Sequence, residues 1–255
     1  MITNKKIVLT GAGSGIGLEV LRLLAFEGGN TIFAVDKDVS RISGFGDNVI
    51  PYVMDVASKE GVDAIFEDAH KAMGTIDIFY ANAGYPYYEI IDYVDWDRAR
   101  RIFDTNVLSP IYSYEKYREY LKGKEGQFAI TVSAIGKMAV PGYTLYSASK
   151  FAMHGFQQGL RFELPKNIKL TCLYPIATDT NFFKTANPKE FEKPFPVQKP
   201  DHVAKKMYEG LEKGAKSVNP SKLFSLAELL FVLCPPIKSA YLFLENNKLK
   251  RFIKK

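Results

Sequence analysis

The stretch Thr10-Gly-Ala-Gly-Ser-Gly-Ile-Gly17 stands between a short apolar run at residues 7–10 and a helical pattern. The run is typical of a buried strand, and the apolar side chains that follow recur with the helical period at Ile16, Val20, Leu23 and Leu24. Glycines at this place let a dinucleotide pyrophosphate approach the backbone, and free N–H groups at the helix start meet its charge. The stretch therefore predicts a dinucleotide-binding turn formed by Gly11, Ser14, Gly15, Ile16 and Gly17.

The same alternation of strand and helix continues along the chain. Further strands are predicted at 31–35, 49–54, 76–81, 128–132 and 170–174, and helices at 62–73, 97–121 and 147–164. Strands that alternate with helices favour an α/β fold, with a parallel sheet and helices on both faces. We expect one domain over residues 1–219, followed by an apolar and basic C-terminal extension at 220–255.

Composition and charge exclude several classes of protein. Of the 255 residues, 47% are hydrophobic and 24% are charged, which is typical of a globular chain rather than a disordered or disulfide-rich one. The net charge is +6, and the last eleven residues hold five Lys or Arg against one acid, so the rest of the chain is close to neutral. A nucleic-acid-binding surface needs basic residues spread over one face of the fold. No nucleic-acid partner is therefore expected.

Cysteine and histidine usage gives no sign of a metal or redox centre. Cys172 and Cys234 are far apart in apolar surroundings, and each is predicted to be a buried structural thiol. The three histidines are not paired at a ligand spacing, so no metal site is expected. The first residues lead directly into a strand without a signal-peptide pattern, and a cytoplasmic location is the expectation.

Asp36 ends the second predicted strand, about twenty residues after the glycines. A carboxylate there accepts hydrogen bonds from the adenosine ribose hydroxyls and repels a 2′-phosphate, which favours NAD over NADP. Lys37 follows directly and partly offsets that repulsion. The alternative is a solvated carboxylate in a turn.

Tyr146 and Lys150 are four residues apart at the start of a predicted helix, so they share one face. A free tyrosine has a pKa of about 10 and exchanges protons poorly at neutral pH. A neighbouring ammonium stabilises the phenolate and lowers that pKa. Such a pair is often only an exposed helix face, but here Ser133 follows the fifth predicted strand, thirteen residues upstream of Tyr146.

Five motifs together resemble those of the short-chain dehydrogenase/reductases, in order and near the expected spacing: Thr10-Gly-x-x-x-Gly-Ile-Gly17, Asn82-Ala-Gly84, Asn106, Ser133 and Tyr146-x-x-x-Lys150. The resemblance covers about residues 5 to 180 and implies a single-domain Rossmann-type, doubly wound sheet. It also implies an oxidoreductase that transfers a hydride between NAD(H) and a small-molecule secondary alcohol or ketone, with NADP the less favoured cofactor.

The resemblance also assigns roles to individual residues. Tyr146 would exchange a proton with the substrate oxygen, Lys150 would lower its pKa and bond the nicotinamide ribose, Ser133 would hold the substrate oxygen, and Asn106 would anchor a water. The cofactor-binding residues it implies are Gly11, Ser14, Gly15, Ile16, Gly17, Asp36, Asp55, Val56, Asn82, Ala83, Gly84, Tyr146, Lys150, Pro175 and Thr178. One departure is Ile176, where the family commonly has glycine after the proline.

Two segments bear on the substrate. Residues 178–200 combine four prolines with four phenylalanines, which indicates either a lid over an apolar ligand or a surface loop pinned to the core by its rings. Met138, Val140 and Tyr143, beside the predicted site, also favour an apolar substrate. The stretch 223–244 is apolar, but its longest uncharged run, 229–237, is too short to span a membrane.

Several alternatives remain open at this point. The C-terminal extension packs on the core or a partner subunit, borders the substrate cleft, or lies on an anionic membrane surface. The family often forms homodimers or homotetramers through two long helices, here predicted at 97–121 and 147–164. A non-catalytic dinucleotide sensor on the same fold is the alternative function. Epimerisation of a sugar nucleotide is a third, although it normally needs a larger substrate domain.

Overall fold

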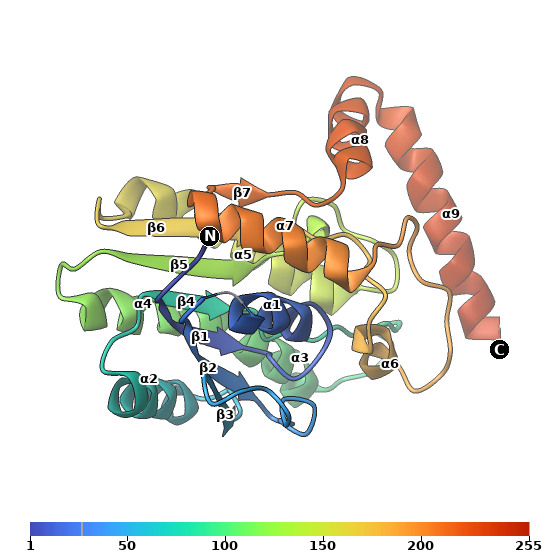
Figure 1. Ribbon diagram of the computed structural model, residues 1–255. Helices are drawn as coiled ribbons and strands as arrows, with labels where there is room; N and C mark the ends of the chain where they lie inside the picture. Colours follow the sequence, from blue (N-terminus) through green and yellow to red (C-terminus); the bar gives the residue numbers. More distant parts are fainter. Residues whose placement is uncertain (27, 255) are drawn as a thin grey trace.

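In the computed structural model, which describes residues 1–26 and 28–254, a parallel seven-stranded sheet has the order β3-β2-β1-β4-β5-β6-β7 (Figure 1). The strands are β1 (Lys6–Thr10), β2 (Thr31–Asp36), β3 (Val49–Val53), β4 (Ile78–Ala81), β5 (Gly126–Thr131), β6 (Ile168–Leu173) and β7 (Ser217–Val218). Strand order reverses between β1 and β4, where open α/β sheets bind ligands outside their carboxyl ends.

Helices cover both faces of this sheet, as the alternating pattern predicted. One face carries α1 (Gly15–Phe26) and α7 (Pro200–Lys213), and the other carries α2 (Lys59–Met73), α4 (Ser109–Leu121) and α5 (Thr144–Glu163) (Figure 1). Alternate side chains of β1 point to opposite faces, so Ile7 and Leu9 pack with α1 and α7, while Val8 packs with α2 and α4. The α/β expectation is confirmed.

The helix expected over 97–121 is not continuous. It divides into α3 (Trp96–Phe103), a π-helical turn over Asp104–Leu108, and α4. Pro110 has no N–H to bond the carbonyl of Asn106, four residues earlier, as a regular α-helix would require. π-Helical turns of this kind occur frequently at functional sites, and this one contains Asn106.

After residue 174 the chain forms three elements that were not predicted from the sequence. They are α7 and β7, together with the short α6 (Phe182–Ala186) inside the 178–200 segment. An isolated bridge between Thr178 and Gln198 brings the two ends of that segment together. The segment is therefore a closed loop on the body of the fold.

The C-terminal extension forms a hairpin of two helices, α8 (Lys222–Leu233) and α9 (Pro235–Lys254), which projects at one end of the molecule (Figure 1). Within the described residues no single helix is long and apolar enough to cross a membrane, but this pair passes the length and composition test together, with a bend of 119°. The expectation of a buried thiol at Cys234 is wrong, because that residue lies exposed at the bend, whereas Cys172 is buried. Lys255 lies outside the described residues.

Candidate active site

The glycine turn connects β1 to α1 and packs tightly against the end of β4. Gly11 has a left-handed φ of 67°, and a Cβ there would lie 2.8 Å from the Cα of Ala83. A Cβ on Gly17 would lie 1.9 Å from the carbonyl oxygen of Gly11. Only glycine fits at these two positions. The turn therefore presents bare backbone, which is what a pyrophosphate requires.

Asn82 ties the glycine turn to two neighbouring strands. Its Nδ2 donates to the carbonyl oxygens of Thr10 and Gly11, both at 3.2 Å, and its Oδ1 accepts a hydrogen bond from Thr131 at 2.9 Å. Thr10 Oγ1 in turn accepts from the backbone of Asn82 and Ala83. This network holds the ends of β1, β4 and β5 together. The contributions of Thr10 and Thr131 were not predicted from the sequence.

Asp36 is fixed at the end of β2, in the pocket that begins at the glycine turn. Its carboxylate accepts from the backbone N–H of Gly13 at 2.7 Å and of Asp38 at 3.2 Å. Lys37 forms an ion pair with Asp55 at 2.8 Å, and both side chains are more than half exposed. The positive charge beside Asp36 is thus matched by a second carboxylate.

A cavity of about 770 Å³ runs from the glycine turn past the ends of β4, β5 and β6. Most of the residues predicted from the sequence line it, namely Gly11, Ser14, Gly15, Ile16, Gly17, Asp36, Val56, Asn82, Ala83, Gly84, Ser133, Tyr146, Pro175 and Thr178. Asp55, Lys150 and Asn106 do not line it. Asp55 faces Lys37 at the surface, while Lys150 and Asn106 lie buried behind the wall.

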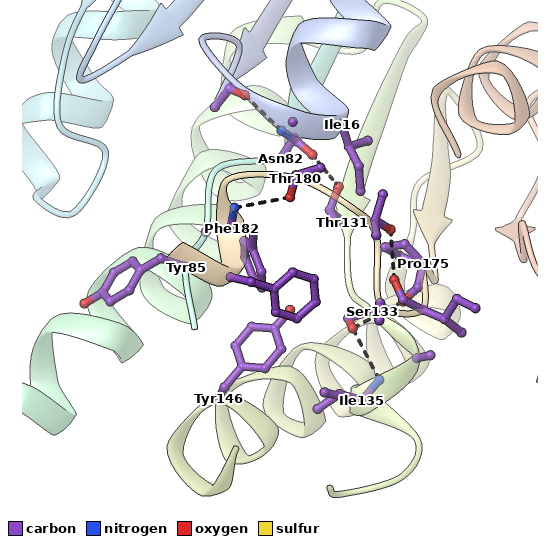
Figure 2. Close-up of a pocket in the computed structure, with 18 of the residues that line it drawn as sticks. Ile16, Asn82, Tyr85, Thr131, Ser133, Ile135, Tyr146, Pro175, Thr180 and Phe182 are labelled. Atoms are coloured by element: carbon purple, nitrogen blue, oxygen red, sulfur yellow. Dashed lines mark hydrogen bonds between the residues drawn. The ribbon is translucent and has the colours of Figure 1, made fainter. Parts of the chain in front are cut away.

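Ser133 and Tyr146 both line this cavity (Figure 2). Ser133 follows β5 with a left-handed φ of 95°, a strained conformation for a residue that carries a Cβ. Its Oγ accepts from the N–H of Ile135 at 3.3 Å and lies 3.4 Å from the carbonyl oxygen of Pro175. Tyr146, in the first turn of α5, faces Phe182 of the closed loop, with ring centroids 5.6 Å apart.

Lys150 lies one helical turn after Tyr146, as the spacing predicted. Its Nζ donates to the carbonyl oxygen of Thr131 at 3.0 Å and lies 5.7 Å from the Tyr146 ring centroid. Burial lowers the pKa of Lys150 to about 8. Burial also raises the pKa of Tyr146, while the hydrogen-bonding influence of Ser133 lowers it. Desolvation of the phenol, which raises the pKa of Tyr146, therefore outweighs the lowering that was expected from Lys150.

Asn106 connects the π-helical turn to the floor of the cavity. Its Nδ2 donates to the carbonyl oxygen of Tyr85 at 2.9 Å and to Ser149 Oγ at 3.1 Å, and its Oδ1 accepts from the N–H of Tyr85 at 3.0 Å. A Cβ on Gly84 would lie 3.0 Å from this Oδ1 and 3.6 Å from Lys150 Nζ. Asn106 and Lys150 thus stand beside the same stretch of backbone.

The far part of the cavity is apolar and comes from segments distant in sequence. The closed loop contributes Phe182, Phe183 and Phe195, and α8 contributes Leu223, Phe224, Ala227 and Phe231. Met138, Val140 and Tyr143 complete it, as the sequence indicated. One of the alternatives for the C-terminal extension was that it borders the substrate cleft, but the individual residues of α8 were not predicted. The apolar character of 223–244 was the only feature of the sequence that pointed to them.

Comparison with known proteins agrees with this geometry. The family model described as short chain dehydrogenase matches residues 5–190. The chain belongs to the short-chain dehydrogenase/reductase family. An uncharacterized oxidoreductase from Staphylococcus aureus strain MW2 is 31% identical to this short-chain dehydrogenase over 204 residues, which cover 76% of this chain and 86% of that protein. Another from Staphylococcus saprophyticus is 27% identical over 219 residues, covering 80% and 88%.

Solved structures show the same fold as this short-chain dehydrogenase. A short chain dehydrogenase from Burkholderia cenocepacia in complex with NADP has a TM-score of 0.77 at 22% identity, covering 92% of this chain and 96% of that one. A short chain dehydrogenase/reductase from Burkholderia phymatum in complex with NAD has a TM-score of 0.74 at 18% identity, covering 91% and 94%. Both nicotinamide cofactors therefore occur among its structural neighbours.

Proposed function

We propose that this short-chain dehydrogenase is an NADH-dependent reductase of an apolar ketone, which it converts to a secondary alcohol. The observation that carries the proposal is that Ser133 and Tyr146 line the same cavity as the glycine turn and Asp36. A dinucleotide whose pyrophosphate lies at the glycine turn would extend along this cavity. Its nicotinamide end would then lie next to a carbonyl held beside Ser133 and Tyr146.

Tyr146 is the proton donor of the proposed reduction. Its hydroxyl carries a proton at neutral pH, because burial raises its pKa further above the ordinary value, so a proton is present for transfer. Ser133 Oγ–H donates a hydrogen bond to the carbonyl oxygen, and Tyr146 transfers its proton to that oxygen. A nicotinamide held beside these two side chains would supply the hydride. The Lys150 ammonium, 5.7 Å from the phenol ring, stabilises the phenolate that remains.

The acidic end of β2 supports NAD over NADP. The Asp36 carboxylate keeps acceptor capacity for ribose hydroxyls, even with the Gly13 and Asp38 N–H groups bound to it. A 2′-phosphate would meet this carboxylate at close range, and Lys37, which would otherwise attract it, is paired with Asp55.

A screen of ketones against both cofactors tests the proposal. Purified protein should oxidise NADH, and NADPH much less, in the presence of apolar ketones such as steroids, retinoid-like ketones or long-chain acyl ketones. Small sugars should give little turnover, because the far part of the cavity offers mostly apolar side chains. Tight NADH binding without turnover of any carbonyl would instead support the dinucleotide-sensing alternative.

We also propose that two copies of the chain associate through the outer face of α5. Phe151, Gly155, Gly159 and Phe162 follow one another there at helical spacing, and all four are exposed. A Cβ on either glycine would meet no atom within 4 Å, so a second helix has room to approach closely. Gly155→Glu should reduce the sedimentation mass to that of one chain. An unchanged mass would place the contact elsewhere.

A further inference from the structure

The α8–α9 hairpin has one face that is used by the cavity and one that is not. The inner side of α8 contributes Phe224, Ala227 and Phe231 to the cavity wall. Glu228, on the same side, forms an ion pair with Lys137 at 3.0 Å, which holds α8 against the body. Other positions of the two helices, which do not line the cavity, expose large apolar side chains. We call Leu226, Leu229, Val232, Leu233, Phe243 and Leu244 the outer face of the hairpin.

Contacts between α9 and the body of the fold hold the hairpin in a defined position. Glu245 of α9 is only 5% exposed and pairs with Lys248 at 2.8 Å, and Lys248 also donates to the carbonyl oxygen of Lys193. Phe252 packs against Tyr88 of the body with ring centroids 5.1 Å apart. The C-terminal half of α9 is therefore anchored to the body, and the bend between α8 and α9 projects beyond it (Figure 1).

Basic side chains continue the outer face along α9. Phe243, Lys250 and Lys254 are seven and four residues apart, so they lie on one side of the helix. Among residues 1–26 and 28–254, Lys250 and Lys254 have no ion-pair or hydrogen-bond partner, whereas Arg251 pairs with Glu192 at 3.1 Å. An apolar face that ends in unpaired lysines is the pattern of helices that rest on anionic lipid surfaces.

The mouth of the cavity lies next to this face. Leu223 of α8 and Phe195 of the closed loop both line the cavity, yet they are 57% and 69% exposed. They mark the rim where the cavity meets the surface, and Leu226 and Leu229 lie one and two turns further along α8. A bilayer against the outer face would thus border the mouth.

We propose that the outer face of the α8–α9 hairpin docks on the surface of an anionic lipid bilayer. The apolar side chains enter the upper part of the acyl layer, and Lys250 and Lys254 lie among the headgroups. A second part of this inference rests on the proposed function: the apolar ketone passes from the lipid into the cavity between α8 and the closed loop, without crossing water.

Vesicle flotation with the full-length chain tests docking without any need for turnover. The vesicles contain either phosphatidylcholine alone or phosphatidylcholine with phosphatidylglycerol. Val232→Ser with Leu233→Ser removes apolar side chains that do not line the cavity. Lys250→Glu with Lys254→Glu reverses the unpaired charges. Phe26→Ser with Val94→Ser removes two apolar side chains that are even more exposed but lie outside the hairpin, and serves as the control.

The unmodified chain should float with the anionic vesicles, and the Phe26 and Val94 control should float equally well. The Val232 and Leu233 variant should lose at least about tenfold in partitioning, because each such side chain contributes more than that when fully buried. The Lys250 and Lys254 variant should lose its preference for phosphatidylglycerol. Circular dichroism and NADH binding check that each variant is folded.

Two results would overturn docking: no flotation of the unmodified chain with either vesicle, or equal loss in the control. A change of sedimentation mass in the Val232 and Leu233 variant without a change in flotation would show that a second copy covers the face instead. If no ketone is turned over at all, the proposed function fails, and flotation still decides docking. If turnover occurs, only ketone presented in vesicles should lose rate in this variant, and a small water-soluble ketone should not.

Discussion

The two ends of the cavity are built in opposite ways. At the glycine turn, backbone and short polar side chains form a hydrogen-bonded network through Thr10, Asn82 and Thr131. At the other end, aromatic rings of the closed loop and α8 meet with few polar contacts, as in the 5.6 Å pair of Phe182 and Tyr146. Directional bonds fix one geometry, whereas apolar packing tolerates a change of shape at similar volume. The first end is suited to one constant cofactor, and the second to selecting a substrate.

Tyr146→Phe tests whether chemistry takes place where the two ends meet, and we expect it to have the largest effect. The change removes the proton donor and leaves the ring packed against Phe182. Turnover should fall at least about a hundredfold, since general acid catalysis contributes on the order of 10²–10⁴-fold. NADH binding, followed by fluorescence titration, should be unchanged.

Tyr114→Phe is the matched control. The hydroxyl of this buried tyrosine of α4 has no hydrogen-bond partner in the described part of the chain, and the residue does not line the cavity. Its loss should leave turnover close to that of the unmodified protein. Near-normal turnover of Tyr146→Phe, or an equal loss in both variants, would contradict the assignment of Tyr146 as the proton donor.

The same contrast explains which parts of the molecule could be predicted from the sequence. The glycine turn, Asp36 and the i, i+4 pair of Tyr146 and Lys150 are local patterns, and the structure places them near one another as their strands and helices predict. The hydrogen bonds of Asn106 to Tyr85 and Ser149 could not be predicted, because these residues are distant in sequence and meet only in the fold.

For the apolar end of the cavity, only the composition of its segments could be predicted from the sequence, and not which residues line it. Prolines and phenylalanines marked the 178–200 segment, but the bridge between Thr178 and Gln198 that closes it is a tertiary contact. Nothing in the periodicity of 223–244 distinguishes Phe231, which lines the cavity, from Val232, which is 77% exposed. The direction of the Tyr146 pKa also depends on burial, which no spacing of residues reveals.

Asp36→Ala tests whether the polar end selects the cofactor. Loss of charged hydrogen bonds to the ribose should raise the Kd for NADH at least about tenfold. The Kd for NADPH should stay the same or fall, because the repulsion of a 2′-phosphate is removed. Asp38→Ala removes an exposed carboxylate nearby that does not line the cavity, and should change neither constant. Parallel losses for both cofactors in Asp36→Ala would indicate a structural role in the turn.

Phe231→Ala tests whether the apolar end selects the substrate. Removal of this ring should raise KM for a large apolar ketone by up to about tenfold, with kcat for a small ketone nearly unchanged. Leu230→Ala, on the adjacent and more exposed side of α8, should have little effect, since Leu230 does not line the cavity. A similar rise of KM for small and large ketones would show that Phe231 supports the fold of the site rather than the fit of the substrate.

The smallest expected effect is a pH dependence of kcat/KM, which follows from the burial of Lys150 close to the point where the two ends of the cavity meet. Its pKa is lowered to about 8, so the side chain is charged at pH 7 and loses its proton as the pH rises through 8. The pKa of Tyr146 is raised, so the phenol keeps its proton over the same range. If charged Lys150 stabilises the phenolate, kcat/KM for reduction should fall about fourfold between pH 7 and 8.5. Lys150→Arg keeps its charge throughout this range, so any activity that remains should vary little with pH. A decline that persists in Lys150→Arg would assign the titration to another group and would show that the charge of Lys150 does not assist proton transfer.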